Sequence, residues 1–163
     1  MTEEEWDECE DYFGLLGNIP PVHSIYIHRK IACEFARLVW NDLPPLGQEA
    51  LSECEKLAAG QSDSEICSRY QKQLQELLID GGESQPLSVV IWALQEDTAS
   101  YPSHYSAQLA GLNIINSEAG TPHQLCQIIR KNIPDDVADM IYPNQKVIDI
   151  MEKLADHTDR ESD

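Results

Sequence analysis

SIYIHRKIACEFARLVWN, at residues 24–41, is the stretch that decides the fold class. Ser24 is of a residue type that caps helix N-termini. The large apolar residues that follow recur at the period of one face of an α-helix; they are Ile27, Ile31, Phe35, Leu38 and Val39. The stretch therefore predicts an amphipathic helix over residues 24–41, with its apolar face toward a core.

Segments further along the chain repeat this pattern. Apolar stripes at helical spacing run over residues 46–58 and 66–78, and the break LPPLG before the first of them predicts an antiparallel hairpin with the 24–41 helix. Pro86 and the pair Thr121 and Pro122 are typical of helix starts, and Gly111 leaves open whether a helix continues or ends there. A last helix is predicted from about residue 144.

SVVIWAL, at residues 88–94, is the one run that also fits a strand. Its β-branched residues favour a strand, but no neighbouring run of alternating pattern could pair with it. We therefore predict a buried helix here. The expected fold is an all-α, single-domain bundle of about six to eight short helices in antiparallel hairpins. The domain is predicted to span residues 1–155, with a frayed polar tail over 156–163.

The N-terminus is the most acidic part of the chain. Its first twelve residues hold seven carboxylates and no Lys or Arg. Thr2 and Glu5 stand in the relation of a capping box, which predicts a helix that starts there and stops near Gly17. A docked helix with a solvated outer face is the favoured interpretation, and a partner surface or a flexible tail are the alternatives. In the favoured interpretation Trp6 docks on the 24–41 helix, where Trp40 could meet it.

Charge and cysteine content limit the function classes. With 29 acidic against 11 basic residues the formal charge is −18, which disfavours direct binding to nucleic acid or to an anionic membrane and favours a basic protein partner. No apolar run is long enough to span a membrane, and the acidic start differs from a secretory signal, so a cytoplasmic location is expected. The five cysteines form no C-x-x-C pair and are expected to be reduced thiols.

Four segments resemble an uncharacterised family of bacterial proteins common in planctomycetes. They are MTEEEWDECED at residues 1–11, RKIACEFARLVW at 29–40, QLCQIIRKNIPDD at 124–136 and ADMIYPNQKVIDIMEKLAD at 138–156. The family's counterpart of the 29–40 helix is richer in Cys and Arg, which weakens any metal or redox role for that helix here. The resemblance implies a recurring helical fold and no activity. The residues that it carries over are Trp6, Arg29, Lys30, Trp40, Ile141 and Tyr142.

Residues that could carry chemistry do not form a recognisable motif. The chain has no P-loop, G-x-G-x-x-G, H-E-x-x-H or G-x-S-x-G pattern. His123 and Cys126 could share one helix face, but two ligands are too few for a structural zinc site. Cys33 and Cys54 lie on or beside apolar stripes, where a thiol is ordinarily inert. We therefore expect no metal, no cofactor and no catalytic residue.

The sequence favours a non-enzymatic, acidic helical module that binds a basic protein partner. Two alternatives stay open: a nucleic-acid mimic that inhibits a DNA-binding protein, and a small enzyme with a cryptic Cys/His site. A small basic spot on the 24–41 helix and an aromatic anchor from Trp92, Tyr101 and Tyr105 are further candidates. The candidate partner-facing residues are Trp6, Arg29, Lys30, Arg37, Trp40 and Tyr142.

Overall fold

The computed structural model describes residues 2–20, 24–81 and 84–142, and this part of the chain is all-α, as predicted. The described residues hold nine α-helices and one short 3-10 helix. The elements are α1 (Glu3–Glu8), α2 (Tyr12–Gly17), α3 (Ser24–Arg37), η1 (Trp40–Asp42), α4 (Pro45–Ala58), α5 (Ser64–Gly81), α6 (Gln85–Leu94), α7 (Ser103–Asn116), α8 (Pro122–Lys131) and α9 (Asp135–Ile141).

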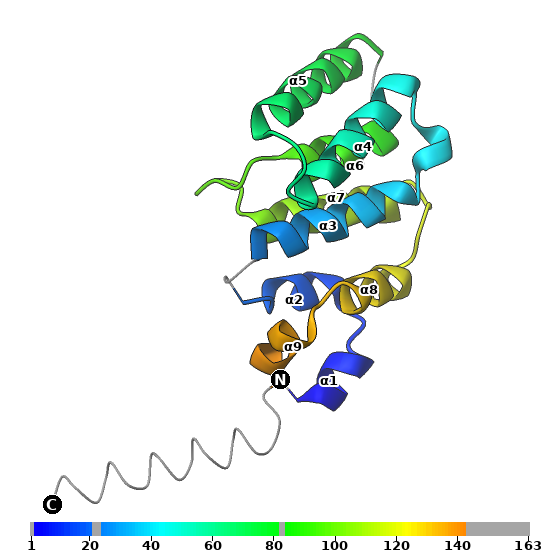
Figure 1. The fold of residues 1–163 in the computed structure, drawn as a ribbon. Coiled ribbons are helices and arrows are strands. Elements are labelled where there is room, and N and C mark those ends of the chain that lie inside the picture. The colour runs from blue at the N-terminus through cyan, green and yellow to red at the C-terminus, as the bar shows by residue number, and fades with distance from the viewer. Residues whose placement is uncertain (1, 21–23, 82–83, 143–163) are drawn as a thin grey trace, which may run out of the picture.

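Helix α3 lies at the centre of the bundle. It packs most extensively against α7, and also against α4, α6 and α8. Figure 1 shows α3 and α7 side by side across the middle, with α4, α5 and α6 on one side and α1, α2, α8 and α9 on the other. The predicted stripe is largely confirmed, because its members Ile27, Ile31, Phe35 and Val39 are buried while Leu38 is half-buried.

The helix predicted over residues 24–41 ends earlier than expected, at Arg37. The N–H groups of Leu38 and Val39 donate to the carbonyls three residues before them, at 3.0 Å and 3.2 Å, which tightens the last turn. Trp40 then begins the 3-10 helix η1 that turns the chain toward α4. The predicted hairpin of α3 and α4 is present, with η1 as part of its connection.

SVVIWAL is helical and lies within α6, as predicted. This helix contacts α3, α4, α5 and α7, so apolar residues are buried on more than one of its faces. Burial on several sides explains why the segment lacks the polar face of an ordinary surface helix. Pro86 lies in its first turn, and the side chain of Ser84 accepts a hydrogen bond from the N–H of Leu87.

The acidic N-terminal segment forms two short helices where one was predicted. The first ends at Glu8, with Cys9 after it in an extended conformation. Asp11 begins the second, because its side chain accepts the N–H of Phe13 at 3.1 Å as the N-cap of α2. This division brings the helix count above the predicted range. The helix predicted from residue 144 and the predicted tail over 156–163 lie outside the described residues.

Candidate protein-interaction surface

Helix α1 begins with the predicted capping box. The hydroxyl of Thr2 accepts the N–H of Glu5 at 3.1 Å, and the carboxylate of Glu5 accepts the N–H of Thr2 at 2.8 Å. Glu3, Glu4 and Glu5 occupy the first turn, where negative charge interacts favourably with the helix dipole. The high density of acids is therefore compatible with a folded helix.

Trp6 fixes α1 to the rest of the protein. Its side chain is 2 % exposed, and its ring centroid lies 6.1 Å from that of Tyr142. Arg130 of α8 donates from Nε and Nη2 to the Trp6 carbonyl, at 3.1 Å and 2.7 Å, and also donates to the carbonyl of Cys9. The acidic start is therefore docked, with one apolar side chain inward and its backbone held by a guanidinium.

The aromatic neighbour of Trp6 differs from the expected one, Trp40. The ring beside Trp6 is that of Tyr142, whereas Trp40 has the guanidinium of Arg37 over its ring at 4.2 Å. In Figure 1, α1 lies at the opposite side of the bundle from the connection between α3 and α4 that contains Trp40. The expectation that Trp6 and Trp40 meet is therefore wrong.

Helix α9 adds a second acidic stretch next to α1. Its Val137 and Ile141 are buried, whereas Asp135, Asp136 and Asp139 are exposed. Burial raises the pKa of the Tyr142 phenol, and the carboxylates of α1 and α9 raise it further because they disfavour a nearby phenolate. The carboxylates that act on this one ring are Glu3, Asp7, Asp135 and Asp139.

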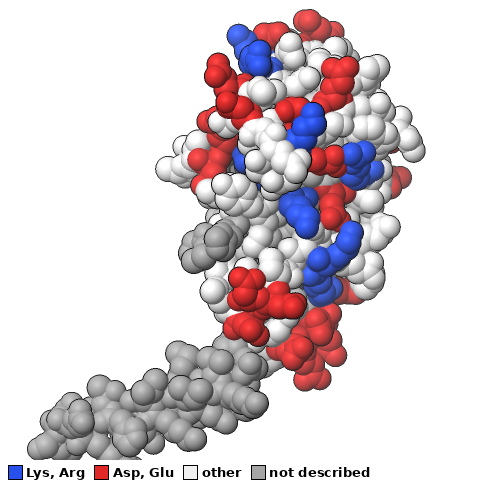
Figure 2. All heavy atoms as spheres, in the orientation of Figure 1, with Lys and Arg blue, Asp and Glu red and all other residues white. Residues whose placement is uncertain are grey.

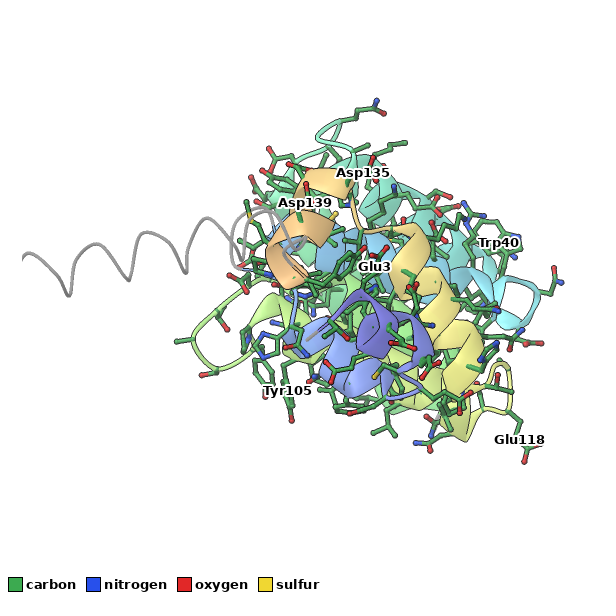
Figure 3. The ribbon with its side chains drawn as sticks, turned by 90° about the horizontal axis from the view of Figure 1, so that it is seen from below. Glu3, Trp40, Tyr105, Glu118, Asp135 and Asp139 are labelled. Carbon is green, nitrogen blue, oxygen red and sulfur yellow. The ribbon has the colours of Figure 1, made fainter. Side chains whose placement is uncertain are left out.

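These two helices form a continuous acidic region, which we call the acidic end. Figure 2 draws one face of the molecule and shows carboxylates at its lower end, with Lys and Arg above them. Figure 3 shows Glu3, Asp135 and Asp139 from below. Helices α1 and α9 contain no Lys or Arg. Within the described part of the chain, none of these carboxylates forms an ion pair. The acidic end consists of Glu3, Glu4, Glu5, Asp7, Glu8, Asp135, Asp136 and Asp139.

The six candidate partner-facing residues do not form one site. Trp6 and the half-buried Tyr142 lie together beneath the acidic end. Arg37 forms a bidentate pair with Glu55, at 2.6 Å and 2.5 Å, and covers Trp40 near the other end of α3.

Arg29 and Lys30 are the remaining two candidates. Arg29 is half-buried and donates to the Gln95 carbonyl at 3.2 Å. Lys30 is exposed and borders a different groove, beside Cys33 and Glu34. The three basic residues of α3 therefore have different surroundings, and two of them already hold partners within the chain.

His28 is a buried polar residue whose role the sequence did not indicate. Its Nδ1 lies 2.9 Å from the Ser103 hydroxyl and its Nε2 lies 3.1 Å from the Leu16 carbonyl. Since a carbonyl only accepts, Nε2 carries the proton and Nδ1 accepts from Ser103. Burial lowers the pKa of His28 to about 4, so the ring is neutral at pH 7.

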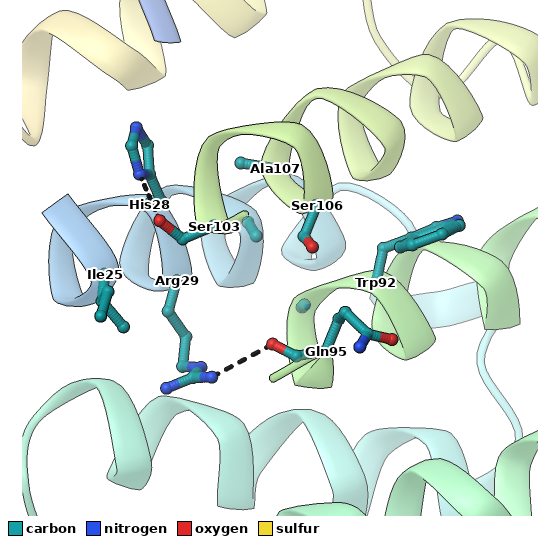
Figure 4. A pocket seen from close by; sticks show the side chains of 10 residues that line it. Ile25, His28, Arg29, Trp92, Gln95, Ser103, Ser106 and Ala107 are labelled. Carbon is teal, nitrogen blue, oxygen red and sulfur yellow. Dashed lines mark hydrogen bonds between the residues drawn. The ribbon is translucent and has the colours of Figure 1, made fainter. Parts of the chain in front are cut away.

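Ser103 and His28 are close enough to act as a nucleophile and its base. The hypothesis of a small enzyme can therefore be tested on the space around this pair. Figure 4 shows the cavity beside the pair, which Arg29, Trp92 and Ser106 also line. Its volume of about 10 Å³ leaves room for roughly one water molecule. The geometry therefore fits a buried histidine with both ring nitrogens bonded better than it fits a substrate site.

The residues that were considered as metal ligands, His123 and Cys126, do not form a metal site. The His123 ring lies 3.0 Å from the Gln127 amide and 3.5 Å from the Glu10 carboxylate, while Cys126 is fully buried. Over residues 2–20, 24–81 and 84–142, no three His, Cys, Asp or Glu side chains lie where they could hold one ion. No helix in the same ranges is long and apolar enough to cross a membrane.

Comparison with known proteins gives no guide to the site: no protein family, curated protein or solved structure matches this chain. Function is therefore inferred from the geometry and charge of the chain itself.

Proposed function

We propose that this protein is a non-enzymatic interaction module whose acidic end binds a basic segment of a partner protein. The observation that carries the proposal is that the exposed carboxylates of α1 and α9 lie at the same end of the bundle, on two helices without Lys or Arg. Carboxylates of both helices raise the pKa of the same phenol, that of Tyr142. The carboxylates are exposed and have no cationic partner in the described part of the chain. Such a surface attracts a basic partner and rejects an acidic one.

The docking of Trp6 supports the same proposal. A flexible acidic tail would lose conformational entropy when a partner ordered it. Here the Tyr142 ring and the Arg130 guanidinium hold α1 before any partner arrives. Because α1 is already ordered, more of the electrostatic attraction is retained as affinity.

Two variants of equal charge test the proposal. The first carries Glu3→Gln, Asp7→Asn, Asp135→Asn and Asp139→Asn. The control carries Glu49→Gln, Glu65→Gln, Glu76→Gln and Asp80→Asn, which are exposed carboxylates of α4 and α5. Both variants lose four negative charges, so they differ in position rather than in net charge.

Fluorescence anisotropy with a labelled oligolysine peptide at low salt measures the binding. We expect the first variant to bind about tenfold more weakly than the parent, because four exposed charge pairs of a few tenths of a kcal/mol each sum to roughly 1.4 kcal/mol. The control variant is expected to lose much less affinity for the peptide. Equal losses in the two variants would show that only net charge matters and would contradict a localised site.

A further inference from the structure

Two buried cysteines from different helices are in direct contact. Cys33 of α3 is 2 % exposed and Cys54 of α4 is 0 % exposed, and their sulfur atoms lie 3.3 Å apart. The Cys33 thiol donates to Cys54 Sγ, and the Cys54 thiol donates to the Ala93 carbonyl of α6 at 3.2 Å. Hydrogen bonds therefore hold the two sulfurs facing each other.

A groove gives small molecules a route to this pair. Cys33 forms part of its wall, and the groove has a volume of about 400 Å³. Its other lining residues come from α3, from α4 and from the residue after α4, and they include both charges and small apolar side chains; they are Lys30, Glu34, Glu55, Ala58 and Ala59. A small uncharged oxidant could enter such a groove, whereas Cys54 lies behind Cys33 against α6.

We propose that Cys33 and Cys54 form a peroxide-sensitive dithiol that closes to an intramolecular disulfide. The Cys33 thiolate attacks hydrogen peroxide and breaks its O–O bond, which gives the sulfenic acid of Cys33 and a hydroxide ion. This hydroxide takes up the proton that the Cys33 thiol had lost and becomes one water. Cys54 then attacks Cys33 Sγ through its own thiolate, the S–S bond forms, and the leaving hydroxide takes a proton to become a second water. Overall, two thiols are oxidised and one peroxide is reduced to two waters.

The geometry favours this pair over the other thiols. A disulfide bond is about 2.05 Å long, so the two sulfurs, now 3.3 Å apart, need only a small side-chain movement to bond. Cys67 is also buried, and it is near enough to Cys54 for a thiolate there to raise the pKa of the Cys67 thiol, which makes Cys67 the competing partner. Cys9 and Cys126 lie on the other side of the bundle, near Arg130.

The pKa of Cys33 sets the expected pH dependence. The hydrogen bond with Cys54 and burial both raise the pKa of the Cys33 thiol well above its usual value. Glu55 raises it further and Arg29 lowers it, while Lys30 and Glu34 border the groove. Because the thiolate is the reactive form, oxidation should be slow at neutral pH and become faster as the pH rises toward the raised pKa of Cys33.

The test treats the reduced, full-length protein with hydrogen peroxide and analyses it by mass spectrometry without reduction. We expect an intact mass lower by two hydrogen atoms, a linked peptide containing Cys33 and Cys54, and reversal by dithiothreitol. Circular dichroism before and after treatment establishes that the protein stays folded. A disulfide between another pair, or oxygen adducts without a disulfide, would overturn the proposal.

Three variants keep the test decisive. Cys54→Ala and Cys54→Ser are expected to abolish the linked peptide and leave oxygen adducts on Cys33, and either folded variant suffices. Cys126→Ser is the matched control, since it removes a buried thiol elsewhere, and it should leave the Cys33–Cys54 link unchanged. Persistence of all five free thiols in the folded parent at pH 9, where an unfolded sample is oxidised, would also overturn the proposal.

Discussion

Trp6→Ala is expected to lower the free energy of unfolding by about 3–5 kcal/mol, the range for truncating a large buried aromatic residue. The side chain is 2 % exposed and packs beside Tyr142, so its removal leaves a cavity next to the Tyr142 ring. The carbonyl contacts of Arg130 depend on the position of the same residue, so they would weaken as well. Urea denaturation followed by circular dichroism measures the change.

Two control variants separate burial from other causes. Tyr26→Ala removes an aromatic side chain of α3 that is 56 % exposed, and we expect a change within about 0.5 kcal/mol. Glu3→Gln combined with Glu4→Gln should cost less than about 1 kcal/mol, since these carboxylates are exposed. An unchanged midpoint for Trp6→Ala would mean that α1 is not docked in solution.

Gly111→Ala is expected to destabilise the protein by about 1–3 kcal/mol, the cost of overpacking a core. A Cβ at this position would lie 2.8 Å from Tyr12 Cε2, 3.2 Å from Leu125 Cδ1 and 3.3 Å from Phe35 Cε2. In an exposed helix the same substitution would stabilise by roughly 0.5–1 kcal/mol, so the expected sign is reversed. The reason is that α2, α3 and α8 all approach α7 at this glycine.

Gly17→Ala provides the matched control because a Cβ there would meet nothing within 4 Å. Thermal or chemical denaturation measures the stability of the two variants. We expect Gly111→Ala to be less stable than the parent, and Gly17→Ala to be unchanged or more stable. A stabilised Gly111→Ala would contradict the close packing of these helices around α7.

Most of the longer helices were predictable because they have local signals. Capping residues mark the starts of α1 and α8, and a period of three to four residues marks the buried face of α3. The burial of Trp6 followed from the same kind of signal. The partners of Trp6 could not be predicted in this way. Arg130 is 124 residues away in sequence, and periodicity does not say which helix covers which face.

Local signals also failed where side chains compete for backbone groups. Asp11 divides the N-terminal helix by capping α2, although one continuous helix also fits the pattern. The contact of Cys33 with Cys54, 21 residues apart, and the pairing of His28 with Ser103, 75 residues apart, depend on how helices cross. The clustering of α1 with α9 into one acidic end likewise joins opposite ends of the described chain.

The most direct test of the acidic end as a binding surface is an NMR titration of the ¹⁵N-labelled protein with the oligolysine peptide. If the account holds, chemical-shift changes concentrate on residues of α1 and α9 and on Tyr142, and they weaken as salt screens the charges. Shift changes spread evenly over the acidic residues of α4 and α5 as well, or concentrated away from α1 and α9, would contradict it.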